Sequence, residues 1–395
     1  MNAERGTMNA GMKTVALRSA LRVVRSTFRV LTSASSVHRS SFIVHRSLIL
    51  CLLLAFPVAA SAWKPQASGT LAWLRAVYFV DGRTGWAVGS KGALLATTDG
   101  GRTWSVRRRP TEDTLRDVYF LNERTGWLVC DRSIYLLRTK EESRSYLMKT
   151  TDGGDTWARV FVTGADTDVL LTRVTFVDEG RGWAFGEMGA LYATTDGGAT
   201  WARQIVPTKN LLLGGAFLLN GQGWLVGAGN TLLHTPDGGS QWRAGSSPVT
   251  TTTRFNAVAF VDERRGWAVG ERGLVLVTKN GGYIWLRQES NVRVDLSDVK
   301  FTDERTGWAV GAEGTIIHTT DGGQTWQTEA SGTRHPLERL SVARERGRAW
   351  AVGFGGTIIA YADDARAPAP PRLKTPDPET PKERPRRATP NTATR

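Results

Sequence analysis

One short polar stretch stands out as a place where chemistry could occur. TTDGGRTW (97–104) sets a carboxylate among hydroxyl-bearing residues, two glycines and a tryptophan, and the pattern Thr-x-Asp-x-Gly-x-Thr-Trp returns, with some changes, in five further copies. A loop carboxylate can act as a general acid or base, or bind a cation. The acidic position of the six copies is held by Asp99, Asp152, Asp196, Asp237, Asn280 and Asp321.

Histidine and cysteine provide no stronger candidate. His234 and His318 each stand just before the first Thr of a copy, where other copies carry Ala, Lys or Val, so we expect strand residues in separate repeats. His335 is isolated, no Cys, His and Asp cluster has metal-site spacing, and neither a G-x-S-x-G turn nor a phosphate-binding loop occurs. The sequence therefore indicates no catalytic residue, metal or cofactor, although carboxylates from distant loops could still pair as acid and base.

The elements that must position these loops come from an internal repeat. A Gly-Trp or Ala-Trp pair recurs with spacings of 41, 56, 41, 43, 41 and 42 residues. Each unit reads as four short strands, as in VYFVD, TGWAVG, ALLATTD and TWSVRR, and none shows a helical period. Seven such units predict an all-β, seven-bladed β-propeller of four-stranded antiparallel blades. The repeated tryptophans are Trp86, Trp127, Trp183, Trp224, Trp267, Trp308 and Trp350.

The place of the polar loop within this repeat favours a structural role. The loop falls between the third and fourth strands, where an Asp side chain can accept hydrogen bonds from turn N–H groups and Gly can adopt a positive φ. The fourth and fifth copies, TPDGGSQW and TKNGGYIW, keep the glycines and the Trp while losing a Thr or the Asp. Such tolerance is typical of a turn and not of a catalytic group.

This loop resembles the Asp-box, or BNR repeat, whose copies form structural hairpins on the propeller face away from the ligand site. With its GWAVG and TTDGGxTW units, the stretch 63–365 is similar to the photosystem II stability/assembly factor family. The resemblance implies an exported, seven-bladed propeller that assists the assembly of a membrane-protein complex. Sialidases also contain Asp-boxes, but the FRIP-like segment that supplies one arginine of their triad is missing here. Xyloglucan-degrading hydrolases enclose a cleft between two propellers, and this chain has one.

Arginines recur in two sets. One set lies in the first turn of a unit beside an acidic residue or Asn, which indicates local pairing on a solvated rim. The other set precedes the innermost strand and is expected to converge near the channel mouth on the opposite face, where propellers bind partners. The loop 131–149 makes the second unit longer and should flank this set. We predict partner binding at Arg75, Arg116, Arg173, Lys91 and Arg272.

The two ends of the chain differ from the middle in charge. Residues 1–62 carry eight Lys and Arg against one Glu, and residues 366–395 carry eight against three acids, which leaves 35 against 33 between them. The net charge of +14 therefore belongs to the two ends, and the nearly neutral middle argues against nucleic-acid binding by the folded part. LILCLLLAFPVAASA (48–62) has the form of a secretory signal, and the Pro-rich stretch from Arg366 onward should stay extended. We expect a periplasmic or secreted protein, with membrane association left open.

The seventh unit lacks a fourth strand, and WKPQASGT (63–70) matches WQTEASGT (326–333). The N-terminal stretch is therefore expected to complete the last blade. The sequence as a whole favours a non-enzymatic, monomeric propeller whose partner is a protein, with membrane-protein subunits as the expected class. The alternatives are a sialidase-like glycoside hydrolase and a carbohydrate-binding propeller.

Overall fold

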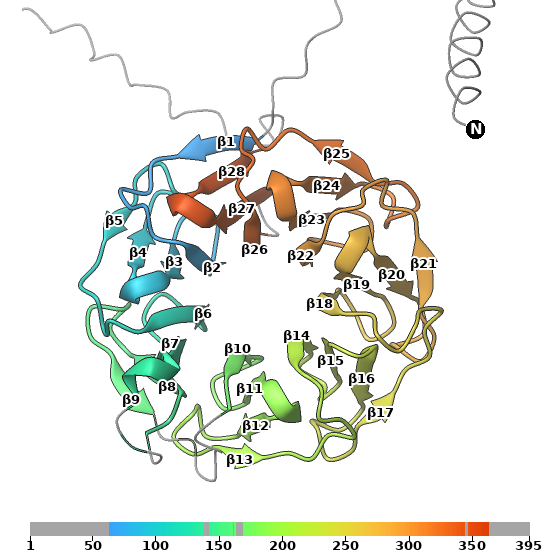
Figure 1. Ribbon diagram of the computed structural model, residues 1–395, viewed down its shortest axis with the longest axis horizontal. Helices are drawn as coiled ribbons and strands as arrows, with labels where there is room; N and C mark the ends of the chain where they lie inside the picture. Colours follow the sequence, from blue (N-terminus) through green and yellow to red (C-terminus); the bar gives the residue numbers. More distant parts are fainter. Residues whose placement is uncertain are drawn as a thin grey trace, which may run out of the picture. The chain divides into compact units, whose positions relative to one another are not determined.

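The computed structural model describes residues 63–362, apart from 138, 140–141, 161, 163–168 and 344–346. In this part the strands form seven four-stranded antiparallel sheets, arranged as blades around a central axis (Figure 1). The predicted seven-bladed propeller is confirmed. The expected leader (1–62) and Pro-rich tail (366–395) lie outside the described residues. Among the residues that are described, no helix has both the length and the apolar character needed to cross a membrane.

Each blade runs from an inner strand beside the axis to an outer strand at the rim. The inner strands are β2 (Leu74–Phe79), β6 (Thr114–Phe120), β10 (Leu171–Phe176), β14 (Leu212–Phe217), β18 (Phe255–Phe260), β22 (Leu296–Phe301) and β26 (Leu337–Ala343). The second strands are β3 (Gly85–Gly89), β7 (Gly126–Asp131), β11 (Gly182–Gly186), β15 (Gly223–Gly227), β19 (Gly266–Gly270), β23 (Gly307–Gly311) and β27 (Arg348–Gly353). The third strands are β4 (Leu94–Thr97), β8 (Ser145–Thr150), β12 (Leu191–Thr194), β16 (Thr231–Thr235), β20 (Val275–Thr278), β24 (Ile316–Thr319) and β28 (Ile358–Ala362). The outer strands are β5 (Ser105–Val106), β9 (Ala158–Val160), β13 (Ala202–Arg203), β17 (Arg243–Ala244), β21 (Leu286–Gln288), β25 (Gln327–Glu329) and β1 (Trp63–Gln66).

The blades are held to one another by a repeated aromatic contact. In six of the seven cases the repeated Trp of the second strand stacks on the last Phe of the next blade's inner strand, as Trp86 does on Phe120 with ring centres 3.5 Å apart. A Cβ on Gly85, the residue before Trp86, would lie 2.6 Å from the ring of Phe79. Glycine is needed there because any side chain would displace that Phe. The core is therefore a series of interfaces between neighbouring blades and not a single central cluster.

The seventh blade lacks this Phe, and the residue before its Trp differs as well. Its inner strand carries Val342 where the other blades have Phe, and Ala349 replaces the glycine that faces it. The Trp of the preceding blade, Trp308, stacks instead on His318, with ring centres 4.5 Å apart. With the smaller valine in place, the neighbouring position can carry a methyl group.

The N-terminal strand closes the propeller, as predicted. β1 pairs antiparallel with β28, with Trp63 opposite Tyr361 and Gln66 opposite Ile358. Trp63 is 2% exposed, and its indole N–H donates to Glu329 Oε2 of the sixth blade at 2.7 Å. The two ends of the described chain are thus joined in one sheet (Figure 1).

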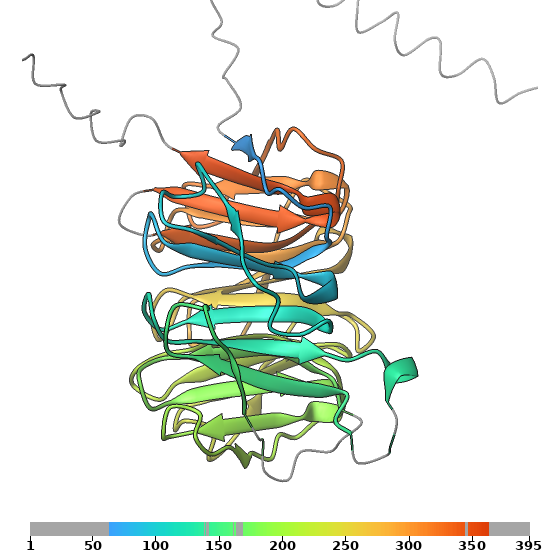
Figure 2. The same ribbon diagram turned by 90° about the vertical axis from the view of Figure 1, so that its left-hand side faces the viewer.

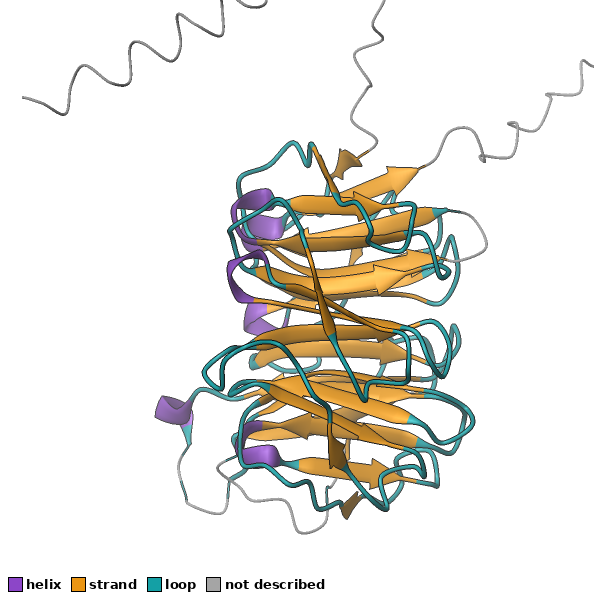
Figure 3. Cartoon of the chain, turned by 90° about the vertical axis from the view of Figure 1, so that its right-hand side faces the viewer, coloured by secondary structure: helices purple, strands orange, loops and turns teal. Residues whose placement is uncertain are grey.

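The propeller has two faces that differ in their loops. One face, the short-helix face, carries 3-10 turns between the second and third strands, and Figure 3 shows these on the same side of the propeller. The Asp-box face carries the polar hairpins between the third and fourth strands. Figure 2 shows the inserted turn η2 (Ile134–Leu136) standing out from the short-helix face. The other turns of that face are η1 (Ser90–Gly92), η3 (Glu187–Gly189), η4 (Glu271–Gly273), η5 (Ala312–Gly314) and η7 (Phe354–Gly356).

Candidate functional site

The polar hairpins are built from hydrogen bonds that each hairpin makes to itself. In the first copy the Thr97 hydroxyl donates to Asp99 Oδ1 at 2.9 Å and accepts from the N–H of Gly101 at 2.9 Å. Asp99 Oδ1 also accepts from the N–H of Thr103 at 3.0 Å, and Oδ2 accepts from the Thr103 hydroxyl at 2.6 Å. The same Thr hydroxyl to Oδ1 bond occurs at Asp152, Asp196, Asp237, Asn280 and Asp321.

Asn280 shows what this position requires. Its Oδ1 accepts from the Thr278 hydroxyl at 3.0 Å and from the N–H of Ile284 at 3.0 Å, the bonds that an Asp makes elsewhere. The position therefore needs an acceptor oxygen and not a negative charge or a proton-transfer group.

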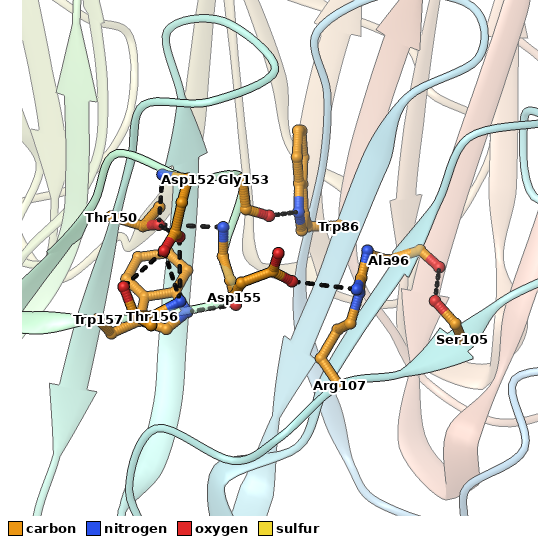
Figure 4. Close-up of polar contacts among 11 residues, drawn as sticks. Trp86, Ala96, Ser105, Arg107, Thr150, Asp152, Gly153, Asp155, Thr156 and Trp157 are labelled. Carbon is orange, nitrogen blue, oxygen red and sulfur yellow. Dashed lines mark hydrogen bonds and ion pairs between the residues drawn. The ribbon is translucent and has the colours of Figure 1, made fainter.

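The same hairpins also fasten neighbouring blades. The indole N–H of Trp86 donates to the carbonyl of Gly153 in the next blade's hairpin at 3.0 Å, and Arg107, which follows β5, pairs with Asp155 of that hairpin at 3.1 Å (Figure 4). The equivalent Trp to Gly bond occurs at Trp224, Trp267 and Trp350. The polar groups of this face are thus used within the fold.

Asp99→Ala is expected to lower the free energy of unfolding by about 1 to 3 kcal/mol, near the lower end because the side chain is partly exposed. Burial tends to raise the pKa of Asp99, but hydrogen bonds from Thr103 and Thr97 outweigh it and lower the pKa from 3.8 to about 2. The difference between wild type and variant should therefore be constant above about pH 5 and shrink as the pH falls toward 2. Chemical denaturation from pH 2 to 7 measures it, and a difference independent of pH would contradict this account.

The histidines lie in separate blades, as expected. His234 belongs to β16 and contacts the Tyr283 ring, and burial followed by the charge of Arg243 lowers its pKa. His318 belongs to β24, and its Nδ1 lies 2.9 Å from Glu329 Oε1. No group of three or more His, Cys, Asp or Glu side chains able to hold a metal ion occurs in the described part of the chain.

Two of the predicted arginines meet on the short-helix face. Arg75 lies over the Trp73 ring, 3.6 Å from its centre, and 3.7 Å from Glu338 Oε1. Arg116 pairs with Asp131 at 3.0 Å, and about a third of each guanidinium-bearing side chain is exposed. Burial lowers the pKa of Arg75, and the positive charge of Arg116 contributes in the same direction. The two cations therefore influence each other electrostatically from neighbouring blades.

Arg173 does not join them, and the expectation that it lies on the same solvated surface is wrong. Arg173 pairs with Phe185, as Ala76 pairs with Val88 in the first blade, so Arg173 is equivalent to Ala76. The residue equivalent to Arg75 is therefore Thr172. A shift of one residue along a strand sends the side chain to the other face. Arg173 points into the channel, where its Nε donates to the carbonyl of Leu213 at 2.7 Å and its side chain is 11% exposed.

Lys91 and Arg272 are the central residues of η1 and η4, with φ values of 54° and 53°. Both side chains are exposed on the short-helix face, but η1 and η4 lie on opposite sides of the propeller (Figure 1). Lys91 shares the first blade with Arg75, whereas Arg272 lies in the fifth. The fold therefore places Lys91 in the blade of Arg75 and Arg272 on the far side of the channel.

Sequence reasoning missed a group of exposed apolar residues on the loops of this face. Tyr135 is 90% exposed in η2, with Ile134 at 55% and Leu136 at 64%. Leu71 is 89% exposed in the connection between β1 and β2, and Phe354 is 46% exposed in η7. Met188 and Ile205 are also exposed, on η3 and on the connection after β13. The sequence signal for this group was the presence of large apolar residues within predicted loops, because such residues are outside the strands that form the core.

The inserted loop is tied to its surroundings by ion pairs. Arg132 contacts Asp113 and Glu142, each at 3.2 Å, and Arg144 contacts Glu187 of η3 at 3.0 Å. These contacts fix the base of the loop and leave the apolar tip at Tyr135 in solvent. The arc from the seventh blade to the third thus combines exposed apolar side chains with two half-exposed arginines.

A family model matches nearly all of the propeller. The model described as photosynthesis system II assembly factor YCF48 matches residues 57–145, 108–209, 201–295 and 285–367. A sequence comparison with curated proteins finds no match for the chain.

Solved structures with a similar fold include two with the same family name. A structure titled "YCF48 bound to D1 peptide" has a TM-score of 0.63 and 20% identity, covering 78% of this chain and 99% of its own. YCF48 from Cyanidioschyzon merolae gives a TM-score of 0.62 and 21% identity over 77% and 99% of the two chains. A GH74 xyloglucanase from Xanthomonas campestris gives 0.60 and 12% over 79% and 55%. At these identities the structures establish the propeller fold and nothing further.

Proposed function

The chain belongs to the photosynthesis system II assembly factor YCF48 family, and on that premise we propose that it is a non-catalytic propeller that binds a protein partner through its short-helix face. The observation that carries the proposal is that exposed apolar side chains and the half-exposed Arg75 and Arg116 occur on the loops and strands of the same arc of blades. Large exposed apolar groups next to arginine are typical of protein interfaces. The Asp-box face is the weaker candidate because the carboxylates of its hairpins accept hydrogen bonds within the hairpin, and hairpin carbonyls accept from the neighbouring blade.

The chemistry of the face fits a polypeptide segment that carries both apolar side chains and carboxylates. Guanidinium groups grip carboxylates through forked hydrogen bonds, and the ring of Tyr135 offers a rigid apolar contact. A family member has been solved with a D1 peptide bound, which supports a protein as the partner class here. We extend the proposal to subunits of a membrane or envelope complex, assembled by a protein exported through the segment 48–62.

Arg75→Ala with Arg116→Ala is expected to weaken partner binding by at least about tenfold and to make the residual binding less salt-sensitive. The midpoint of thermal unfolding should barely move, because both side chains lie at a solvated surface. The assay is a crosslinking pull-down of the purified protein from its native membrane fraction, followed by titration of the recovered subunit.

N-terminal sequencing of the input should give Trp63 as the first residue.

The matched control replaces Arg83, Arg124 and Arg305 on the Asp-box face, all of them exposed, with Ala. This triple variant should bind as wild type does. If it loses binding and the first variant does not, the partner uses the other face. Retention of a polysaccharide without any protein would favour the glycoside hydrolase or carbohydrate-binding alternatives instead.

A further inference from the structure

The channel of the propeller is lined at one level by a mixed set of residues. In β2 this level is held by Ala76, which pairs with Val88 of the second strand. Each other inner strand has one residue in the equivalent pairing. Four blades carry a charge at this level and three carry Ala or Gly. In blade order the residues are Ala76, Asp117, Arg173, Gly214, Ala257, Asp298 and Arg339.

The two carboxylates at this level are already bound to the backbone. Asp117 Oδ2 accepts from the N–H of Val174 in the next blade at 3.0 Å, and Asp298 Oδ2 accepts from the N–H of Leu340 at 3.0 Å. The arginines approach the carboxylates only loosely. Arg173 Nη2 lies 3.8 Å from Asp298 Oδ1, and Arg339 Nε lies 3.9 Å from Asp117 Oδ1. Each carboxylate therefore holds the next blade. Arg173 Nη2 donates to the carbonyl of Asn256 at 3.3 Å, whereas the buried Arg339 Nε has no hydrogen-bond partner among the described residues.

Lys300 adds a third cation two residues after Asp298 on β22. Within the described residues, the buried Arg339 Nε has no hydrogen-bond acceptor, although Arg339 Nη1 donates to the carbonyl of Glu338 at 3.3 Å. Lys300 is partly buried. Burial lowers the pKa of Lys300, and the charges of Arg173 and Arg339 add to the effect against that of Asp298. Burial also lowers the pKa of Arg173, to about 10. Three cations against two carboxylates leave an excess positive charge away from bulk water.

These groups line one cavity. Asp117, Arg173, Asp298, Lys300 and Arg339 share a hollow of about 310 Å³ on the axis, and the small residues Gly215, Ala216 and Ala259 also line it. A water molecule occupies about 30 Å³ in the liquid, so the hollow has room for a polyatomic ion with part of its hydration shell.

We propose that this channel cavity binds a small inorganic oxyanion, phosphate or sulfate, between Lys300, Arg339 and Arg173. An oxyanion presents several acceptor oxygens, which suits the fork of Arg339 and the ammonium of Lys300 better than a single acceptor does. Binding neutralises the excess charge and joins the third, sixth and seventh blades across the axis. This site is separate from the apolar face proposed for the protein partner.

The test measures binding of inorganic phosphate by calorimetry, and the thermal midpoint, at constant ionic strength in a buffer of bulky sulfonate anions. Wild-type protein should bind phosphate saturably and gain thermal stability in parallel. Lys300→Met should bind at least about tenfold more weakly, and without phosphate its midpoint should equal or exceed that of wild type because a repulsive charge is gone. Lys279→Met, a control at an exposed lysine, should behave as wild type.

The outcomes separate the proposal from simpler explanations. Saturable binding in wild type and Lys279→Met but not in Lys300→Met supports the site, and sulfate should compete with phosphate. Absence of saturable binding in wild type overturns it. Equal phosphate binding by Lys300→Met and wild type also overturns it, since the anion would then sit elsewhere. A bromide or selenate soak followed by anomalous scattering would locate the ion directly.

Discussion

Removal of residues 63–70 is expected to lower the thermal midpoint by about 10 °C or more, or to prevent folding altogether. The deletion removes β1, whose four residues pair with β28, and with it the buried indole of Trp63. Loss of a buried Trp side chain alone is worth about 3 to 5 kcal/mol. In a domain of this size each kcal/mol corresponds to roughly 2 °C or more.

The contacts of β1 reach both neighbouring blades, which is why the effect should be large. Trp63 bonds to Glu329 of the sixth blade, and Gln66 donates to the carbonyl of Gly100 in the first at 3.3 Å. Gln66 Oε1 also accepts from the indole N–H of Trp104 at 3.0 Å. Without β1 the edge of β28 is left unpaired and open to other chains.

Differential scanning calorimetry of the deletion variant provides the measurement. Removal of residues 366–395, the matched control, should leave the midpoint unchanged. A deletion of 63–70 that melts like wild type would show that β1 is not needed for closure.

Trp86→Ala is expected to lower the free energy of unfolding by about 3 to 5 kcal/mol. Trp86 is 3% exposed, stacks on Phe120 of the next blade and donates to the Gly153 carbonyl. The substitution therefore removes the stacking partner, leaves a cavity between blades and unpairs a carbonyl at once. Urea denaturation followed by circular dichroism measures the change.

Two variants divide this effect into its parts. Trp86→Phe keeps an aromatic face against Phe120 but has no N–H donor, so a loss of about 1 to 2 kcal/mol is expected. Tyr135→Ala removes an aromatic side chain that is 90% exposed and should leave stability within about 0.5 kcal/mol. An alanine variant at Trp86 as stable as the Tyr135 variant would refute the role given to the stacked pair.

The propeller could be predicted because its interfaces repeat. In six of the seven blades a Gly precedes the repeated Trp and a Phe ends the inner strand, and five of the six spacings are 41 to 43 residues, so each copy supports the interpretation of the others. The seventh blade departs from this pattern at two paired positions, where Val342 replaces the Phe and Ala349 replaces the Gly. Closure by residues 63–70 could be predicted because that stretch matches the sequence that begins at Trp326.

The candidate site was predicted less well because it depends on register and on single residues. Arg173 was aligned with Arg75 although it stands one residue further along its strand, and such a slip moves a side chain from the face into the channel. The charges at Asp117, Asp298, Lys300 and Arg339 occur once each and come together only when the propeller closes. A periodic pattern cannot reveal contacts between residues that do not repeat.

The pairing of β1 with β28 also sets the order in which the chain can fold. Trp63 is synthesised before the rest of the propeller, and its partner Glu329 follows 266 residues later. Each hairpin within a blade can form early, because its strands are close in sequence, whereas the closing sheet must wait for the end of synthesis. Until then the inner surfaces of the first and seventh blades are open to water and to other chains. We therefore expect closure to be a late step of folding, and mutations in β1 to slow folding more than mutations in any single hairpin.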